Sequence, residues 1–190
     1  DMGLDERFPP DRSGPALAPE VEFRVRGLKH MVGNSPLLAI ACTYRGKQRM
    51  VYAKAEHLNM TGSIKDRMAL HILRQGYSRG LLEPNAWIVE ATSGNTGIGL
   101  AMVCSVKGYR LLLAMSEAAS VERQKILAAL GARLELTEGA RGMKGAITRA
   151  EEIQRETPNS IILGQFANPA NPEVHRRTTA VEIWEDTDGA

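Results

Sequence analysis

A lysine stands close to the start of a predicted helix in the segment Asn59–Arg67. Ser63 is followed three residues later by Asp66, a spacing typical of a capping box, which predicts Ser63 as the N-cap and Lys65 as the second helical residue. A cation at that position faces the positive end of the helix dipole, which is unfavourable by about 0.3–1 kcal/mol. The same field favours the neutral amine, the form in which a lysine acts as nucleophile or base. Lys65 is therefore a candidate catalytic residue, and the alternative is a long side chain that bends into solvent.

A second polar cluster is the glycine-rich turn Thr92–Gly97, which lies between a predicted strand and a predicted helix. Ligands of open parallel sheets bind at that end of the strands. The hydroxyl groups of Thr92, Ser93 and Thr96, with the free amides at the helix start, suit a carboxylate or a phosphate. Asn95 can donate or accept a hydrogen bond, so it could orient a phenolic or carbonyl oxygen. The turn matches neither a P-loop nor the G-x-G-x-x-G dinucleotide motif, and a purely structural glycine turn is the alternative.

The segment Gln165–Pro172 also follows a predicted strand. Asn171 and Pro172 predict an N-cap and a first-turn proline, which together open a last helix toward Trp184. Gln165 is different because it stands at the strand end, on the rim that carries the Thr92–Gly97 turn. Its amide could bind the same ligand.

These polar segments are carried by strands and helices that alternate regularly from Trp87 onward. Continuous apolar strands separated by helices of about three turns favour parallel βαβ units covered on both faces, so the predicted fold class is α/β. Upstream, a hairpin is predicted around Arg45-Gly46-Lys47, and the helix that begins near Ser63 should reach about Tyr77. The predicted strands are 37–43, 50–55, 87–89, 109–115, 133–137 and 160–163, and the later helices end near 107, 130 and 156.

Composition narrows the possible function classes. The 190 residues are 43% hydrophobic, and their 24 basic and 22 acidic side chains are interspersed, which argues against nucleic acid as a partner. No apolar run suggests a membrane span, no secretory signal is visible, and the cysteines and histidines show no metal-ligand spacing. These features favour a cytoplasmic protein without a metal site. Residues 1–22, which are rich in proline, predict a flexible N-terminal arm.

Five segments together resemble the β-family of pyridoxal-phosphate enzymes, which have the tryptophan-synthase-like fold type II. They are most similar to cysteine synthase, also called O-acetylserine sulfhydrylase. Each segment is modest alone, but five in family order over residues 30–188 are highly specific. The fourth favours cysteine synthase over its cystathionine-forming relatives. The segments are Gly33–Leu37, Gly62–Arg67, Thr92–Gly97, Gly139–Ala146 and Gln165–Pro172.

The resemblance implies pyridoxal 5'-phosphate as the cofactor, held by Lys65 as a Schiff base, with Asn95 hydrogen-bonded to a ring oxygen. It implies a transferase that makes L-cysteine from O-acetylserine and sulfide by β-replacement, with Lys65 as the base that removes the Cα proton. It also implies a homodimer, and it suggests the C-terminal tail of serine acetyltransferase as a further partner. The residues implied to bind the substrate carboxylate are Thr92, Ser93, Gly94, Thr96 and Gln165.

The resemblance further implies two domains. Residues 85–164 would form a small mobile αβ domain, and residues 23–84 and 165–190 would form the incomplete N-terminal part of the large cofactor domain. Family members continue well beyond this length, with a second glycine-threonine loop for the cofactor phosphate and a hydroxyl residue facing the pyridine nitrogen. Neither motif occurs in this sequence. We therefore expect the chain to be the N-terminal part of a longer enzyme that is not competent alone.

Two alternatives stay open at this point. The chain could belong to a relative that performs another β-replacement or an elimination, such as cystathionine β-synthase or a hydroxyamino-acid dehydratase. It could also be a truncated, non-catalytic scaffold that binds a partner. The products formed from O-acetylserine or serine, each with sulfide or homocysteine, separate the enzymatic readings.

Overall fold

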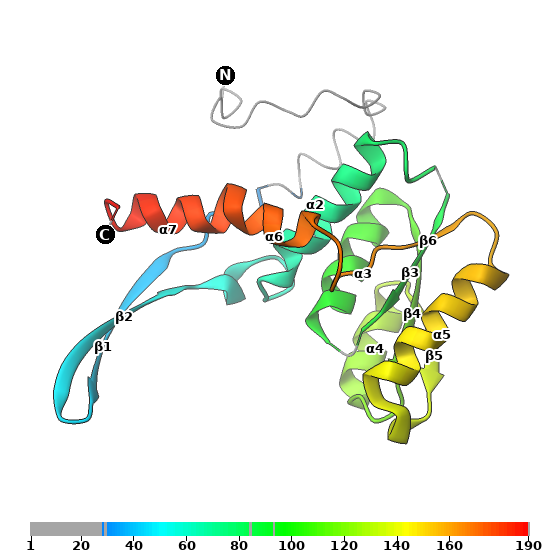
Figure 1. The fold of residues 1–190 in the computed structure, drawn as a ribbon, viewed down its shortest axis with the longest axis horizontal. Coiled ribbons are helices and arrows are strands. Elements are labelled where there is room, and N and C mark those ends of the chain that lie inside the picture. Colours follow the sequence, from blue (N-terminus) through cyan, green and yellow to red (C-terminus); the bar gives the residue numbers. More distant parts are fainter. Residues whose placement is uncertain (1–27, 29, 84, 93, 190) are drawn as a thin grey trace.

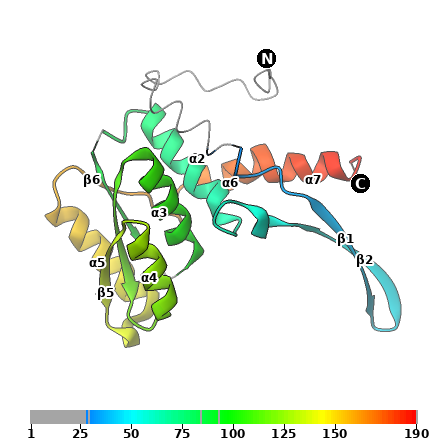
Figure 2. The ribbon, with the colours of Figure 1, turned by 180° about the vertical axis from the view of Figure 1, so that it is seen from behind.

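The computed structural model describes residue 28 and residues 30–83, 85–92 and 94–189. The predicted arm at 1–22 lies outside these residues, and so does Ser93. Figure 1 shows a two-stranded hairpin that projects away from an α/β sheet, with a long helix, α2 (Lys65–Ser78), between the two. Figure 2 shows the same arrangement from behind.

The larger sheet has four parallel strands in the order β5–β4–β3–β6. All four strands predicted from the apolar runs are confirmed, with small shifts at their ends. β3 is an inner strand and pairs with β4 on one side and β6 on the other. The bounds are β3 Trp87–Ala91, β4 Arg110–Ser116, β5 Arg133–Thr137 and β6 Ser160–Ile162.

Helices cover both faces of this sheet, which confirms the predicted α/β class. On one face, Ala146 and Ile153 of α5 pack with Val89 and Ala114. On the other face, α3 and α4 cover the strands, and α2 packs against α3. Within the described residues, no helix has both the length and the apolar character needed to cross a bilayer. The bounds are α3 Asn95–Lys107, α4 Val121–Ala129 and α5 Gly142–Glu156, with the 3₁₀ turn η2 Gly139–Arg141 before α5.

The hairpin consists of β1 (Leu37–Tyr44) and β2 (Lys47–Lys54), which pair antiparallel along their whole length. Its two connecting residues, Arg45 and Gly46, have φ angles of 49° and 70°. Two positive φ angles are typical of the type I′ turn, whose twist matches that of the flanking strands. The predicted hairpin is therefore confirmed. Several of its large apolar side chains are exposed: Leu38, Ile40, Tyr44, Met50, Val51 and Tyr52.

The start of α2 differs from the predicted capping box. Lys65 is the first helical residue, and its amide donates to Ser63 Oγ at 3.2 Å. The Asp66 carboxylate accepts instead from the amide of Thr61 at 2.6 Å and from the Thr61 hydroxyl. The reason is Gly62, whose φ of 86° turns the chain so that Thr61 faces Asp66. The prediction of the helix is right, but the prediction of its cap is wrong.

The C-terminal segment is helical from Ala170 to Asp186, with a π-helical turn in its middle. The prediction that Asn171 is the N-cap of this segment is wrong, because Asn171 lies inside the first helical turn. Asn168 binds the end of the helix instead, accepting from the amide of Ala170 at 3.0 Å, while the Asn171 side chain donates to the carbonyl oxygen of Gln165 at 3.0 Å. The elements are α6 Ala170–Val174, the π-turn η3 His175–Thr179 and α7 Ala180–Asp186.

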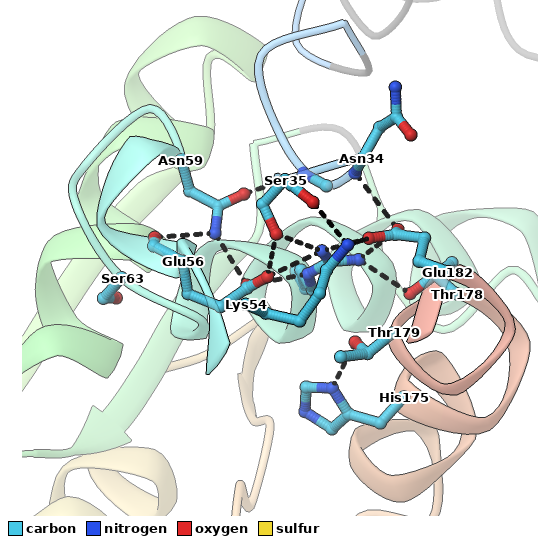
Figure 3. Close-up of polar contacts among 12 residues, drawn as sticks. Asn34, Ser35, Lys54, Glu56, Asn59, Ser63, His175, Thr178, Thr179 and Glu182 are labelled. Carbon is cyan, nitrogen blue, oxygen red and sulfur yellow. Dashed lines mark hydrogen bonds and ion pairs between the residues drawn. The ribbon is translucent and has the colours of Figure 1, made fainter. Parts of the chain in front are cut away.

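A buried arginine and a lysine at the end of the hairpin connect the hairpin, α2 and α7 through shared carboxylates. Arg67 donates to both oxygens of Glu56, at 2.7 and 2.8 Å, and to both oxygens of Glu182, at 2.6 and 2.7 Å. Lys54, at the end of β2, lies 2.9 Å from Glu182. Figure 3 shows Lys54, Glu56 and Glu182 gathered around this point. Glu56 belongs to the 3₁₀ turn η1 (Glu56–Leu58). The four side chains of Lys54, Glu56, Arg67 and Glu182, here called the Arg67 cluster, therefore connect β2, η1, α2 and α7.

Candidate active site

The start of α2 and the loops after β3 and β6 border a cavity of about 370 Å³. The size lies within the usual range for small-ligand sites, about 300–1,000 Å³. Three separate stretches of sequence meet here, and they carry six of the seven site residues predicted from the sequence; the seventh, Ser93, lies outside the described residues. The six are Lys65, Thr92, Gly94, Asn95, Thr96 and Gln165.

Thr92 fixes the glycine-rich turn from within. Its hydroxyl oxygen accepts from the amides of Gly94, at 3.3 Å, and Gly97, at 3.2 Å. A Cβ atom at Gly97 would lie 2.7 Å from Thr92 Cγ2 and 3.2 Å from Leu113 Cδ1, so only glycine fits between the turn and the sheet. The turn is therefore held in one shape, with Asn95 exposed at the first position of α3.

Gln165 connects the two loops that border the cavity. Its side-chain oxygen accepts from the hydroxyl of Thr96 at 2.7 Å, and its amide nitrogen donates to the carbonyl oxygen of Ala91 at 3.1 Å. Gln165 and Thr96 are both buried, with exposed fractions of 8% and 5%. The sequence placed Gln165 on the same rim as the turn, and this placement is confirmed.

Lys65 is half-buried and lines the same cavity as the glycine-rich turn. Its position is set by the neighbouring Asp66, which is fully buried and holds Thr61 on the preceding turn. Burial raises the pKa of the Asp66 carboxyl, and the hydrogen bonds from Thr61 partly oppose this shift. Lys65 therefore belongs to a part of the cavity wall that is fixed by the hydrogen bonds of its neighbour Asp66.

Four further residues line the cavity without having been singled out by sequence reasoning: Ile64, Arg123, Met143 and Phe166. Ile64, Met143 and Phe166 lie in segments that carry the family resemblance. Arg123, near the start of α4, has Nη1 3.9 Å from the Cβ position of Gly94, so its guanidinium lies beside the turn. No local motif marks Arg123, because it reaches the site only through the packing of α4.

The charge of the lining residues indicates the kind of ligand. Lys65 and Arg123 are the basic members of the lining, and no described lining residue is acidic. The turn adds hydroxyl groups and the amides at the start of α3, whose dipole favours an anion. An amine beside an anion cradle can condense with an aldehyde while a carboxylate is held next to it.

Curated proteins that are similar in sequence to this chain include cysteine synthases. Cysteine synthase A of Escherichia coli (strain K12) is 50% identical over 159 residues, which cover 83% of this chain and 48% of that protein. The cysteine synthase of Flavobacterium sp. is 49% identical over 155 residues. The chain spans about half the length of the curated relatives it matches.

Solved structures of related enzymes are also similar to this chain in fold. A hydrogen sulfide-producing enzyme from Fusobacterium nucleatum superimposes with a TM-score of 0.83 at 33% identity, over 88% of this chain and 50% of that one. A cysteine synthase from Entamoeba histolytica superimposes with a TM-score of 0.77 at 36% identity, over 100% of this chain and 53% of that one. The family model described as "Pyridoxal-phosphate dependent enzyme" matches residues 28–190. The chain therefore belongs to the family of pyridoxal-phosphate dependent enzymes.

Proposed function

We propose that the protein makes L-cysteine from O-acetylserine and sulfide by a pyridoxal-phosphate dependent β-replacement. The observation that carries this proposal is one cavity lined by Lys65, by Thr92, Gly94, Asn95 and Thr96 of the glycine-rich turn, and by Gln165. Cysteine synthases that are 45–50% identical to this chain support the choice of reaction.

The donor groups of the cavity fit the cofactor. Lys65 offers one primary amine for the aldehyde, and Asn95 offers an amide for a ring oxygen. Gly97 lets the turn pack closely on the sheet, and Gly94, which lines the cavity, presents no side chain to a ligand. Pyridoxal phosphate, when bound, supplies an aldehyde that captures amines and a ring that stabilises negative charge at a substrate Cα.

Each of the site residues would have its own role in the reaction. Lys65 Nζ would hold the cofactor covalently and, once displaced by the substrate amine, would take the proton from Cα. The amides at the start of α3, the Thr92 hydroxyl and the second side-chain N–H of Gln165 would hold the α-carboxylate, together with Ser93, Gly94 and Thr96. Acetate would leave from Cβ and sulfide would add to the same carbon. We also propose that residues 85–164 close over the substrate as one unit, and that the whole protein is a homodimer.

The products of the reaction test this proposal. The whole protein, loaded with pyridoxal phosphate, is expected to form cysteine from O-acetylserine and sulfide. It is expected to form much less cystathionine from serine and homocysteine, and little keto acid from serine alone. If O-acetylserine and sulfide yield no cysteine while another pair reacts, the assignment to cysteine synthase is wrong. A protein that binds no cofactor but binds the C-terminal tail of serine acetyltransferase would favour the scaffold.

The change Asn95→Ala tests the proposed cofactor contact. We expect kcat/KM to fall about 10- to 100-fold, because a hydrogen bond to a charged group contributes about 1.5–3 kcal/mol. We expect the unfolding free energy to change by no more than about 0.5 kcal/mol, because Asn95 is exposed. Ser105→Ala, an exposed position on the same helix outside this cavity, is the matched control. Equal kinetics for the two variants would remove Asn95 from the site.

A further inference from the structure

A buried glutamate stands in β3, one residue before the end of the strand. Glu90 is 3% exposed, and its neighbours in the strand, Val89 and Ala91, are buried apolar residues. A carboxylate in such a place is unfavourable unless hydrogen bonds or a counter-charge compensate for its lost hydration. Among the described residues, no lysine or arginine pairs with it. Its hydrogen-bond partners are backbone amides.

Backbone amides from two strand ends converge on this carboxylate. Oε2 accepts from the amide of Gly164 at 2.9 Å, and Oε1 accepts from the amide of Ala91 at 3.2 Å. The amide of Gln165 also faces the carboxylate. Burial raises the pKa of Glu90 to about 7, because the loss of hydration outweighs these backbone amides, which favour the charged form. Within the described residues, the Glu90 carboxylate is therefore held by hydrogen bonds from backbone amides.

The position of Glu90 explains what the contact achieves. β3 and β6 pair only from Trp87 with Ser160 to Val89 with Ile162, so the ladder ends just before Glu90. Beyond that point the carboxylate takes the place of the ladder, because it accepts from Gly164 in the loop after β6. The next residue of that loop is Gln165, whose side chain binds Thr96 and the carbonyl oxygen of Ala91.

We propose that Glu90 is a positioning residue, whose carboxylate clamps the loop after β6 so that Gln165 keeps Thr96 in place on the cavity wall. The proposal rests on the proposed function only for its kinetic consequence. The clamp itself is a property of the folded chain. Glu90 does not line the cavity, so it acts through Gln165 and not on the substrate.

The variant Glu90→Gln is nearly isosteric but has a single acceptor oxygen. Its side-chain NH₂ group must face one of the converging amides, donor against donor, so one contact is lost. In the protein without cofactor, we expect hydrogen exchange of the Gly164 and Gln165 amides, measured by NMR, to become at least tenfold faster. Amides in α5 and at Leu113 of β4 should keep their rates. Glu135→Gln, on the edge strand β5, is the matched control and should change neither loop amide.

In the loaded enzyme, Glu90→Gln is expected to raise KM for the amino-acid substrate severalfold with a smaller change in kcat. Glu90→Asp keeps the charge but reaches less far, so its exchange rates should lie between those of the wild type and of Glu90→Gln. It also serves as the second variant if Glu90→Gln does not fold. Unchanged exchange at Gly164, or equal acceleration of all core amides, would overturn the clamp. A protein that makes no cysteine but shows the local exchange response refutes the proposed function and leaves the clamp standing.

Discussion

Replacement of Lys65 by alanine is expected to abolish covalent attachment of pyridoxal phosphate and to lower the rate of cysteine formation by about 10²–10⁴-fold. The loss has two parts, since the amine is proposed both to hold the cofactor and to take the Cα proton, and a positioned base alone contributes about 10²–10⁴-fold. Borohydride reduction followed by peptide mass analysis measures the first part. In the wild type, the cofactor mass should be found on the peptide that contains Lys65.

Lys144→Ala is the control for this experiment. Lys144 is exposed on α5, next to Met143, which lines the same cavity. Its removal takes away a nearby amine without touching the proposed attachment site, so labelling and turnover should stay at the wild-type level. Cofactor trapped covalently in Lys65→Ala, on any peptide, would show that another amine does the work.

The change Arg67→Met is expected to lower the free energy of unfolding by about 3–5 kcal/mol, because it leaves two carboxylates without their buried partner. Arg67 has a side chain that is 2% exposed, against 13% for Glu56 and 16% for Glu182. Urea unfolding of the wild type and the variant measures the difference. The elements η1, α2 and α7 lose their common contact, so η1 and α7 should become mobile first.

Arg149→Met provides the matched comparison. Arg149 also lies near three carboxylates, but its side chain is 34% exposed, so we expect a loss of about 0–1 kcal/mol. Equal losses for the two variants would mean that the Arg67 cluster contributes no more than a surface ion pair.

The Arg67 cluster also makes the free energy of unfolding depend on pH. Burial by itself would raise the pKa of Glu182, but hydrogen bonds from Arg67, Lys54 and the amide of Asn34 lower it to about 2 from its ordinary 4.5. A lowered carboxyl pKa means that this stabilisation is complete above about pH 4.5 and is lost as the pH falls toward 2. In Arg67→Met, unfolding free energy should therefore depend less steeply on pH in that window.

The sequence predicts those elements whose structure depends on local chemistry. Arg45-Gly46 can form the positive-φ turn that the hairpin needs, and the apolar run at Trp87 can only be a buried strand or helix segment, which its flanking turn resolves as a strand. Five of the six described site residues lie at one cavity because they follow the ends of the neighbouring parallel strands β3 and β6, whereas Lys65 reaches it from the start of α2.

The sequence does not predict features that depend on a residue far away in the chain or on a single backbone angle. Asp66 binds Thr61 instead of Ser63 because Gly62 redirects the chain, and Asn168, not Asn171, accepts from the first amide of α6, while the Asn171 side chain binds Gln165. Glu90 carries no motif, since its partners are amides that only the finished sheet brings near. Arg123 enters the site through the packing of α4. The roles of the site residues and the two-domain division stay predictions.

The place of β6 beside β3 has a consequence for biosynthesis. As the polypeptide leaves the ribosome, β3, β4 and β5 emerge in succession and can associate early, whereas β6 emerges last and must return to the far side of β3. Until then one edge of β3 is unpaired, and the Glu90 carboxylate lacks its contact with Gly164. A nascent chain at that stage is prone to self-association and to capture by chaperones, because an open strand edge can pair with another chain.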